Sequence, residues 1–64
     1  MAKYDIEVEL VGGDGNAFVI IGRVAKAIRR EVSAEAADEF TQEATSCESY
    51  DDLLQLVMRT VEVI

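Results

Sequence analysis

The chain has 64 residues, which suffice for one domain, residues 1–64, and half of them are hydrophobic, so a small core can form. Thirteen acidic residues against six basic ones give a net charge of −7, which argues against direct binding of nucleic acid or of an anionic membrane and favours basic or charge-mixed protein partners. The chain has no histidine and one cysteine, Cys47, which excludes His-based triads, His metal sites and a disulfide framework. The sequence therefore predicts no cofactor and no enzyme activity.

The first predicted element is a strand over residues 3–11. Its apolar positions alternate with acidic ones, Tyr4, Ile6, Val8 and Leu10 against Asp5, Glu7 and Glu9. A period of two places the apolar side chains against a core and the acids in water. The acids recur at about 6.6 Å along the strand, which is similar to the spacing of backbone phosphates in DNA. They form a candidate acidic interaction face, and the alternative is an ordinary solvated sheet face.

A glycine-rich loop, Gly12-Gly13-Asp14-Gly15-Asn16, follows this strand. It matches neither a P-loop nor a complete GxGxxG motif. A glycine loop that opens a helix exposes backbone N–H groups at the positive end of the helix dipole, which suits an anion or a nucleotide. The candidate anion site consists of Gly13, Gly15 and Asn16 with Arg23 and Lys26. The alternative is a sharp turn in which the glycines only supply positive φ angles.

A helix is predicted over residues 17–31, with Asn16 as its N-cap. Its apolar stripe recurs at steps of three and four residues, through Phe18, Ile21, Ala25, Ile28 and Val32. The Asp14-Gly15 pair is also a hairpin signal, so a hairpin that pairs residues 8–11 with 18–21 is the alternative. The sustained period favours the helix. Residues 17–32 carry a local charge of +3 and the rest of the chain −10.

Two further helices are predicted, over residues 34–45 with Ser33 as N-cap and over about 50–59 with Ser49 as N-cap. Their expected buried positions are Ala34, Ala37, Phe40 and Ala44 in the first, and Leu53, Leu54, Val57 and Met58 in the second. Residues 60–64 alternate again and resemble a strand. The fold class is therefore α+β, with a two-stranded sheet in the order strand, helix, helix, helix, strand, and with the helices packed on one face. The strand direction stays open.

Two strands leave two open edges, and so short a chain without a disulfide gains stability from association, so a homodimer is expected. The first strand carries acids that would lie close to those of its mate in an antiparallel pair. Residues 60–64 are therefore the expected exchanging edge.

The segments "VELVGGDGNAF" and "YDDLLQLVMRTVEV" resemble a group of small hypothetical proteins encoded by bacteriophages, prophages and other mobile elements. The Gly13-to-Phe18 motif GDGNAF is the most specific part of this resemblance. It implies a role in the cytoplasm of a host cell, and it transfers no catalytic or binding residue. With the acidic composition, it indicates a protein-binding module that modulates a host protein or a host defence. The alternative is a small-anion or nucleotide binder that uses the glycine loop.

Overall fold

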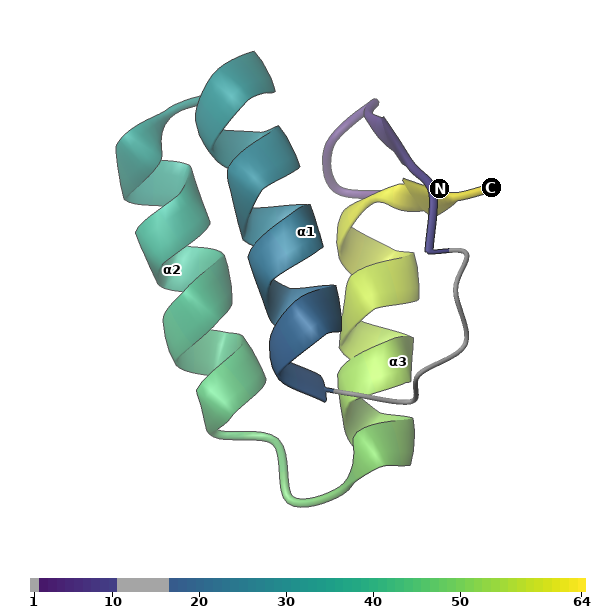
Figure 1. Cartoon of the computed structure of the whole chain (residues 1–64). Helices are drawn as coiled ribbons and strands as arrows, with labels where there is room; N and C mark the ends of the chain where they lie inside the picture. Colours follow the sequence, from purple (N-terminus) through teal and green to yellow (C-terminus); the bar gives the residue numbers. More distant parts are fainter. Residues whose placement is uncertain (1, 11–16) are drawn as a thin grey trace.

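The structure, a computed structural model, describes residues 2–10 and 17–64. Three helices and two short strands follow one another along the chain: β1 (Glu7–Val8), α1 (Ala17–Glu31), α2 (Ala34–Thr45), α3 (Tyr50–Thr60) and β2 (Glu62–Val63). This is the predicted order, and the predicted α+β class is confirmed. Figure 1 shows the helices side by side, with both strands at the same end of the bundle.

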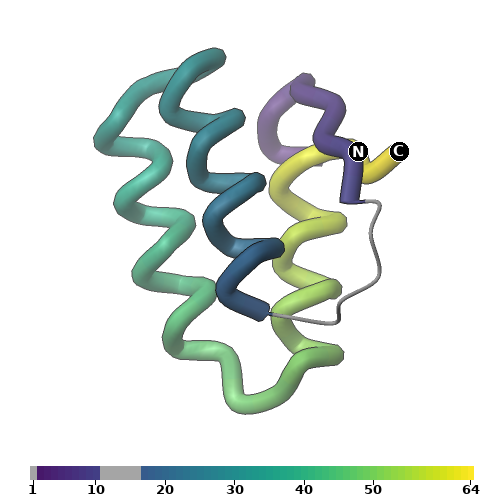
Figure 2. The backbone as a smooth tube through the Cα atoms, in the orientation of Figure 1, coloured from purple at the N-terminus to yellow at the C-terminus, as the bar shows by residue number. Residues whose placement is uncertain are grey.

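The sheet joins the two ends of the described chain, as Figure 2 also shows. The strands run parallel, in a register that pairs Glu7 with Glu62 and Val8 with Val63. Glu62 N donates to the Ile6 carbonyl at 2.8 Å, and Ile64 N donates to the Val8 carbonyl at 3.1 Å. Parallel strands need a long crossover connection, which the three helices supply here.

The N-terminal strand is shorter than predicted. Of the predicted range 3–11, only two residues pair with β2, and residue 11 lies outside the described residues. Upstream of the strand, Lys3 N donates to the Arg59 carbonyl at 2.7 Å and Tyr4 N donates to the Thr60 carbonyl at 2.9 Å. Carbonyls at the end of a helix have no partner within the helix. The start of the chain therefore caps α3 instead of extending the sheet.

The helix α1 occupies the predicted range, Ala17–Glu31. The hairpin alternative is wrong, because residues 18–21, which would form its second strand, are helical. The predicted N-cap, Asn16, lies outside the described residues. The buried face of α1 is centred on Val24 and Ile28, which are fully buried.

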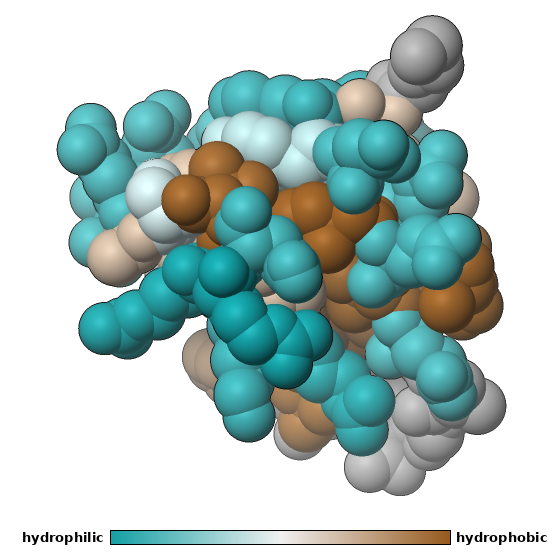
Figure 3. Space-filling model, turned by 90° about the horizontal axis from the view of Figure 1, so that it is seen from above, coloured by the Kyte–Doolittle hydropathy of each residue, from teal (hydrophilic) through white to brown (hydrophobic). Residues whose placement is uncertain are grey.

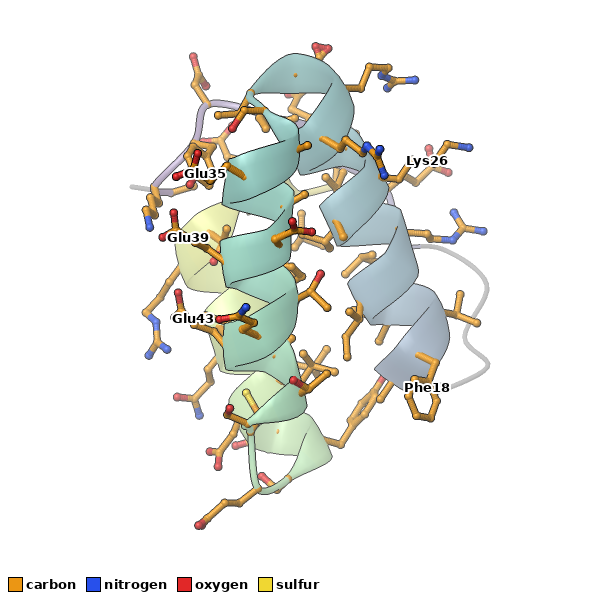
Figure 4. All side chains as sticks on the ribbon, turned by 90° about the vertical axis from the view of Figure 1, so that its left-hand side faces the viewer. Phe18, Lys26, Glu35, Glu39 and Glu43 are labelled. Carbon is orange, nitrogen blue, oxygen red and sulfur yellow. The ribbon has the colours of Figure 1, made fainter. Side chains whose placement is uncertain are left out.

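Two side chains predicted on the apolar stripe of α1 are exposed instead. Phe18 is 81 % exposed, and Val32 just beyond the helix is 45 % exposed. At 3.6 residues per turn, Phe18 lies about 80° around the helix from Ile28 and about 120° from Val24, at the margin of the stripe. Figure 4 shows the Phe18 ring pointing away from the helix bundle. The prediction that Phe18 belongs to the core is therefore wrong.

The helix α2 begins and ends as predicted, at Ala34 and Thr45. Its N-cap is Ser33, whose hydroxyl oxygen accepts a hydrogen bond from Ala36 N at 3.0 Å. Its buried side chains are Ala36, Ala37, Phe40 and Ala44, while Ala34 is exposed. The small alanine side chains allow α2 to pack closely against α1.

The helix α3 runs one residue further than predicted, to Thr60, whose hydroxyl donates to the Leu56 carbonyl at 2.7 Å. The predicted N-cap is confirmed, because the Ser49 hydroxyl oxygen accepts from Asp52 N at 3.1 Å. The expected core positions need one correction: Met58 is 59 % exposed. The buried face consists of Leu53, Leu56, Val57 and Thr60, and Leu54 is half-buried. The buried face of α3 is therefore rotated from the predicted one: Leu56 and Thr60 are buried in place of Leu54 and Met58.

The core lies between the sheet and the three helices. The largest side chains with less than 2 % of their surface exposed are Val24 and Ile28 of α1, Val57 of α3 and Val61 just before β2. The helices cover one face of the sheet, as predicted. Asp5, Glu7 and Glu9 are exposed, and their apolar neighbours are buried or half-buried. The predicted alternation of the N-terminal segment is confirmed.

The two phenylalanines differ in burial, which generates a test of the core. Phe40→Ala should lower the free energy of unfolding by about 3–5 kcal/mol, because the ring is buried and its removal leaves a cavity. Phe18→Ala should lower it by less than about 1 kcal/mol, because most of that ring is already in water. Urea denaturation of both variants checks this. Equal losses would contradict the placement of the two rings.

Candidate functional site

The predicted anion site is only partly described. Gly13, Gly15 and Asn16 lie outside the described residues. Arg23 and Lys26 are exposed on α1. They line one hollow together with Glu7, Val8, Glu9, Ala27 and Arg30.

The charges in this hollow have both signs. Arg23 Nη1 donates to the Glu9 carbonyl at 3.4 Å, so its guanidinium already has an acceptor on β1's side of the hollow. The acidic residues Glu7 and Glu9 line the same hollow as the cations and weaken its attraction for an anion. The small-anion hypothesis stays a prediction.

The predicted acidic face gains one member in the structure. Glu62 of β2 lies beside Glu7 in the parallel register, and both are exposed. A hollow over this face is lined by Asp5, Glu7 and Glu62 and also by the cations Lys3 and Arg30. Like charges directly opposite one another on neighbouring strands are destabilising. The sequence could not reveal this pair, because it depends on the register of two distant segments.

Surface charge is separated between the helices. The exposed basic residues of α1 are Arg23, Lys26, Arg29 and Arg30, and the exposed acids of α2 are Glu35, Asp38, Glu39 and Glu43. Figure 4 shows three of these glutamates along one side of α2 and Lys26 on the far side of α1. The sequence predicted this separation from the local charges of +3 and −10.

A narrow hollow lies between α2, α3 and the start of the chain. Glu39 and Glu43 on α2 face it together with Lys3 and Arg59. Lys3 Nζ lies 5.5 Å from the centre of the Tyr4 ring, within the range of a cation–π interaction. Two cations and two carboxylates therefore line the same hollow beside the buried Phe40 and Leu56, which suits a structural role.

The cysteine offers little chemistry of its own. Cys47 is half-buried in the turn between α2 and α3, and its thiol donates to the Glu43 carbonyl at 3.5 Å. A nucleophilic cysteine needs a base or a nearby cation that stabilises the thiolate. Among residues 2–10 and 17–64, no group of three His, Cys, Asp or Glu side chains could hold a metal ion.

The outer edge of β2 is the remaining candidate, and the sequence predicted it as residues 60–64. Val63 is 41 % exposed and Ile64 is 62 % exposed. Figure 3 shows hydrophobic surface beside hydrophilic side chains on the face of the molecule that is seen from above. A strand edge with apolar side chains is a site where another chain can pair. Of the predicted range, Val61 is buried and belongs to the core.

The hydrogen bonds of β2 determine which of its backbone N–H and C=O groups face β1 and which face outward. Glu62 and Ile64 donate their N–H groups to β1, as described above. In a strand, the backbone groups of successive residues point alternately to the two sides within the sheet. The N–H and C=O groups of Val63 therefore point away from β1, to the outer edge of the sheet. By the same alternation, Glu7 and Glu9 direct their backbone groups to the outer edge of β1.

Comparison of the chain with family models, with curated proteins and with solved structures finds no match. None of the helices in the described part of the chain combines the length and the hydrophobicity that a membrane span requires.

The pair Glu7 and Glu62 gives a test of the register. Glu62→Gln should raise the free energy of unfolding by less than about 1 kcal/mol, because it removes one of two opposed like charges. The gain should shrink at high salt, since both side chains are exposed. Denaturant unfolding of Glu7→Gln, Glu62→Gln and the double variant completes a double-mutant cycle, which separates this repulsion from the effect of neighbouring cations. Strictly additive gains would show that the two carboxylates do not interact.

Proposed function

We propose that the chain is a small, non-enzymatic protein-binding module of a phage or another mobile element. It binds an extended segment of a polypeptide chain at the outer edge of β2. The observation that carries the proposal is this edge, where Val63 directs its N–H and C=O groups away from β1 beside the exposed side chains of Val63 and Ile64. In strand addition, main-chain hydrogen bonds supply affinity and alternate side chains supply specificity.

The two edges of the sheet differ in a way that favours β2. Soluble proteins protect their edge strands with charged side chains, especially lysine, or with covering segments. The edge of β1 has this protection, because Arg23 binds the Glu9 carbonyl and Lys26 and Arg30 line the same hollow. The edge of β2 carries the apolar side chains of Val63 and Ile64, which are 41 % and 62 % exposed. Glu62 is the one charged residue of β2, and an edge that also exposes Val63 and Ile64 suits a binding role.

The proposed partner is a protein. The resemblance to proteins of mobile elements makes a protein of the host cell the first candidate, through which the module would modulate a host function or a host defence. A second copy of the chain is the other candidate. The net charge of −7 favours a basic or charge-mixed partner surface in either case.

A photo-cross-linking experiment in bacterial host cells tests this function. The photoreactive residue benzoylphenylalanine is placed at Ile64, on the edge, or at Asp38, on the exposed side of α2. We expect a covalent protein adduct from position 64 and none from position 38. The substitution Val63→Pro should remove the adduct, because proline lacks the N–H group that points outward. Equal adducts from both positions, or an adduct that survives Val63→Pro, would contradict binding at this edge.

A further inference from the structure

We infer that the edge of β2 is built to pair with the β2 edge of a second copy of the chain. The two strands would run antiparallel about a two-fold axis at Val63 and form a continuous four-stranded sheet, β1-β2-β2-β1. This inference rests on the proposed function, since it names the occupant of the same edge. It follows from the direction of the backbone groups, from the side chains beside them and from the charges of the two edges.

The backbone pattern at Val63 is self-complementary. Glu62 and Ile64 donate their N–H groups to carbonyls of the β1 segment. Val63 lies between them, so its N–H donor and its C=O acceptor point to the outer edge. An antiparallel pair of identical strands centred on one residue forms a hydrogen-bonded pair, in which each copy gives one N–H and takes one C=O. The two copies of Val63 would therefore exchange two hydrogen bonds across the axis, which is the isologous contact of a closed dimer.

The side chains agree with this register. On the helix-covered face, Val63 meets the Val63 of the copy. On the opposite face, Glu62 lies across from the Ile64 of the copy, so no acid faces an acid. The exposed fractions, 41 % for Val63 and 62 % for Ile64, leave apolar surface to bury in the pair. Apolar pairs on one face of neighbouring strands stabilise a sheet.

The edge of β1 cannot form the same kind of pair without repulsion. Its outward-pointing residues are the acidic Glu7 and Glu9. Centred on Glu7, an antiparallel pair places Glu7 across from Glu7, and it places Asp5 across from Glu9. Like charges directly opposite one another destabilise a pair of strands, so charge selects β2 as the pairing edge.

The size of the contact sets its strength. Each strand of the sheet has two residues, and a sheet of two strands is marginal, whereas three or more strands with a buried face gain independent stability. Pairing across β2 doubles the sheet of each copy. The new contact has two backbone hydrogen bonds and a few side chains, which places it among the weak interfaces that bury less than about 1,200 Å².

Sedimentation equilibrium tests the inference. The weight-average mass of the wild-type chain should rise from 7.0 kDa towards twice that value as the concentration increases from about 10 μM to 1 mM. Val63→Pro should stay at 7.0 kDa, because it loses the outward N–H while both donors to β1 remain. The matched control is Ile64→Pro, which loses a donor to β1 and should lower the melting temperature. A wild-type mass of 7.0 kDa throughout, or a Val63→Pro mass that rises as in the wild type, would overturn the inference.

A second pair of variants keeps the test decisive if Val63→Pro does not fold. Val63→Glu and Val63→Lys should each lose at least tenfold in self-association, because like charges then meet across the axis. A mixture of the two in equal amounts should regain it. Equal association of the mixture and of the separate variants would overturn pairing at Val63. The two experiments together separate this inference from the proposed function. If the wild type is monomeric but Val63→Pro still loses the cross-link at position 64, the edge binds a protein other than a second copy. If the cross-link survives in Val63→Pro, both the proposed function and the dimer are contradicted.

Discussion

The parallel pairing of β1 with β2 is the interaction on which the rest of the structure depends. It joins the two ends of the described chain through hydrogen bonds from Glu62 to Ile6 and from Ile64 to Val8. These contacts place Val8 and Val61 over the helices, where both are buried. The helices α2 and α3 begin at local caps, Ser33 and Ser49, but a chain of 64 residues buries only about 60% of the surface that its unfolded chain exposes. Without this non-local contact, the core side chains of α1 and α3 would lose the cover that Val8 and Val61 give them.

The same pairing determines which backbone groups of β2 face outward. Because Glu62 and Ile64 donate their N–H groups to the β1 segment, the N–H and C=O groups of Val63 point to the outer edge of the sheet. On the other strand the groups of Glu7 and Glu9 point outward, beside their own negative charges and the Arg23 guanidinium. The edge of β1 is therefore lined by charges of both signs, whereas the edge of β2 exposes the apolar side chains of Val63 and Ile64 beside a single acid, Glu62. Fold and proposed function share one cause, which is the register of two short strands.

The helices could be predicted from the sequence because their signals are local. Ser33 and Ser49 each stand one residue before a helix and accept a hydrogen bond from a backbone N–H three residues on. The apolar periodicity predicted the helix ranges, but it did not predict that Phe18 and Met58 are exposed. Both lie at the margins of the apolar stripes, and neighbouring elements decide which margin is covered.

The strands and the candidate sites were harder to predict. The alternation predicted a strand of nine residues, but only two of them pair with β2. A strand can pair only where its partner is also extended, and Tyr4 instead donates its N–H group to a carbonyl at the end of α3. The acids at Glu7 and Glu9 were predicted to be exposed, but the approach of Arg23 and the pairing of Glu62 depend on contacts between segments far apart in sequence. The strand character of residues 60–64 was recognisable, since their alternation is a local feature.

Amide hydrogen exchange measured by NMR at several protein concentrations tests the central claim most directly, because it reports on single N–H groups. The account predicts that the amides of Glu62 and Ile64 are protected at every concentration, since both donate within one chain. The amide of Val63 should exchange freely in dilute solution and become protected as the concentration rises. Protection of Val63 at the lowest concentration, or free exchange of Glu62 and Ile64, would contradict the register from which the binding edge is inferred.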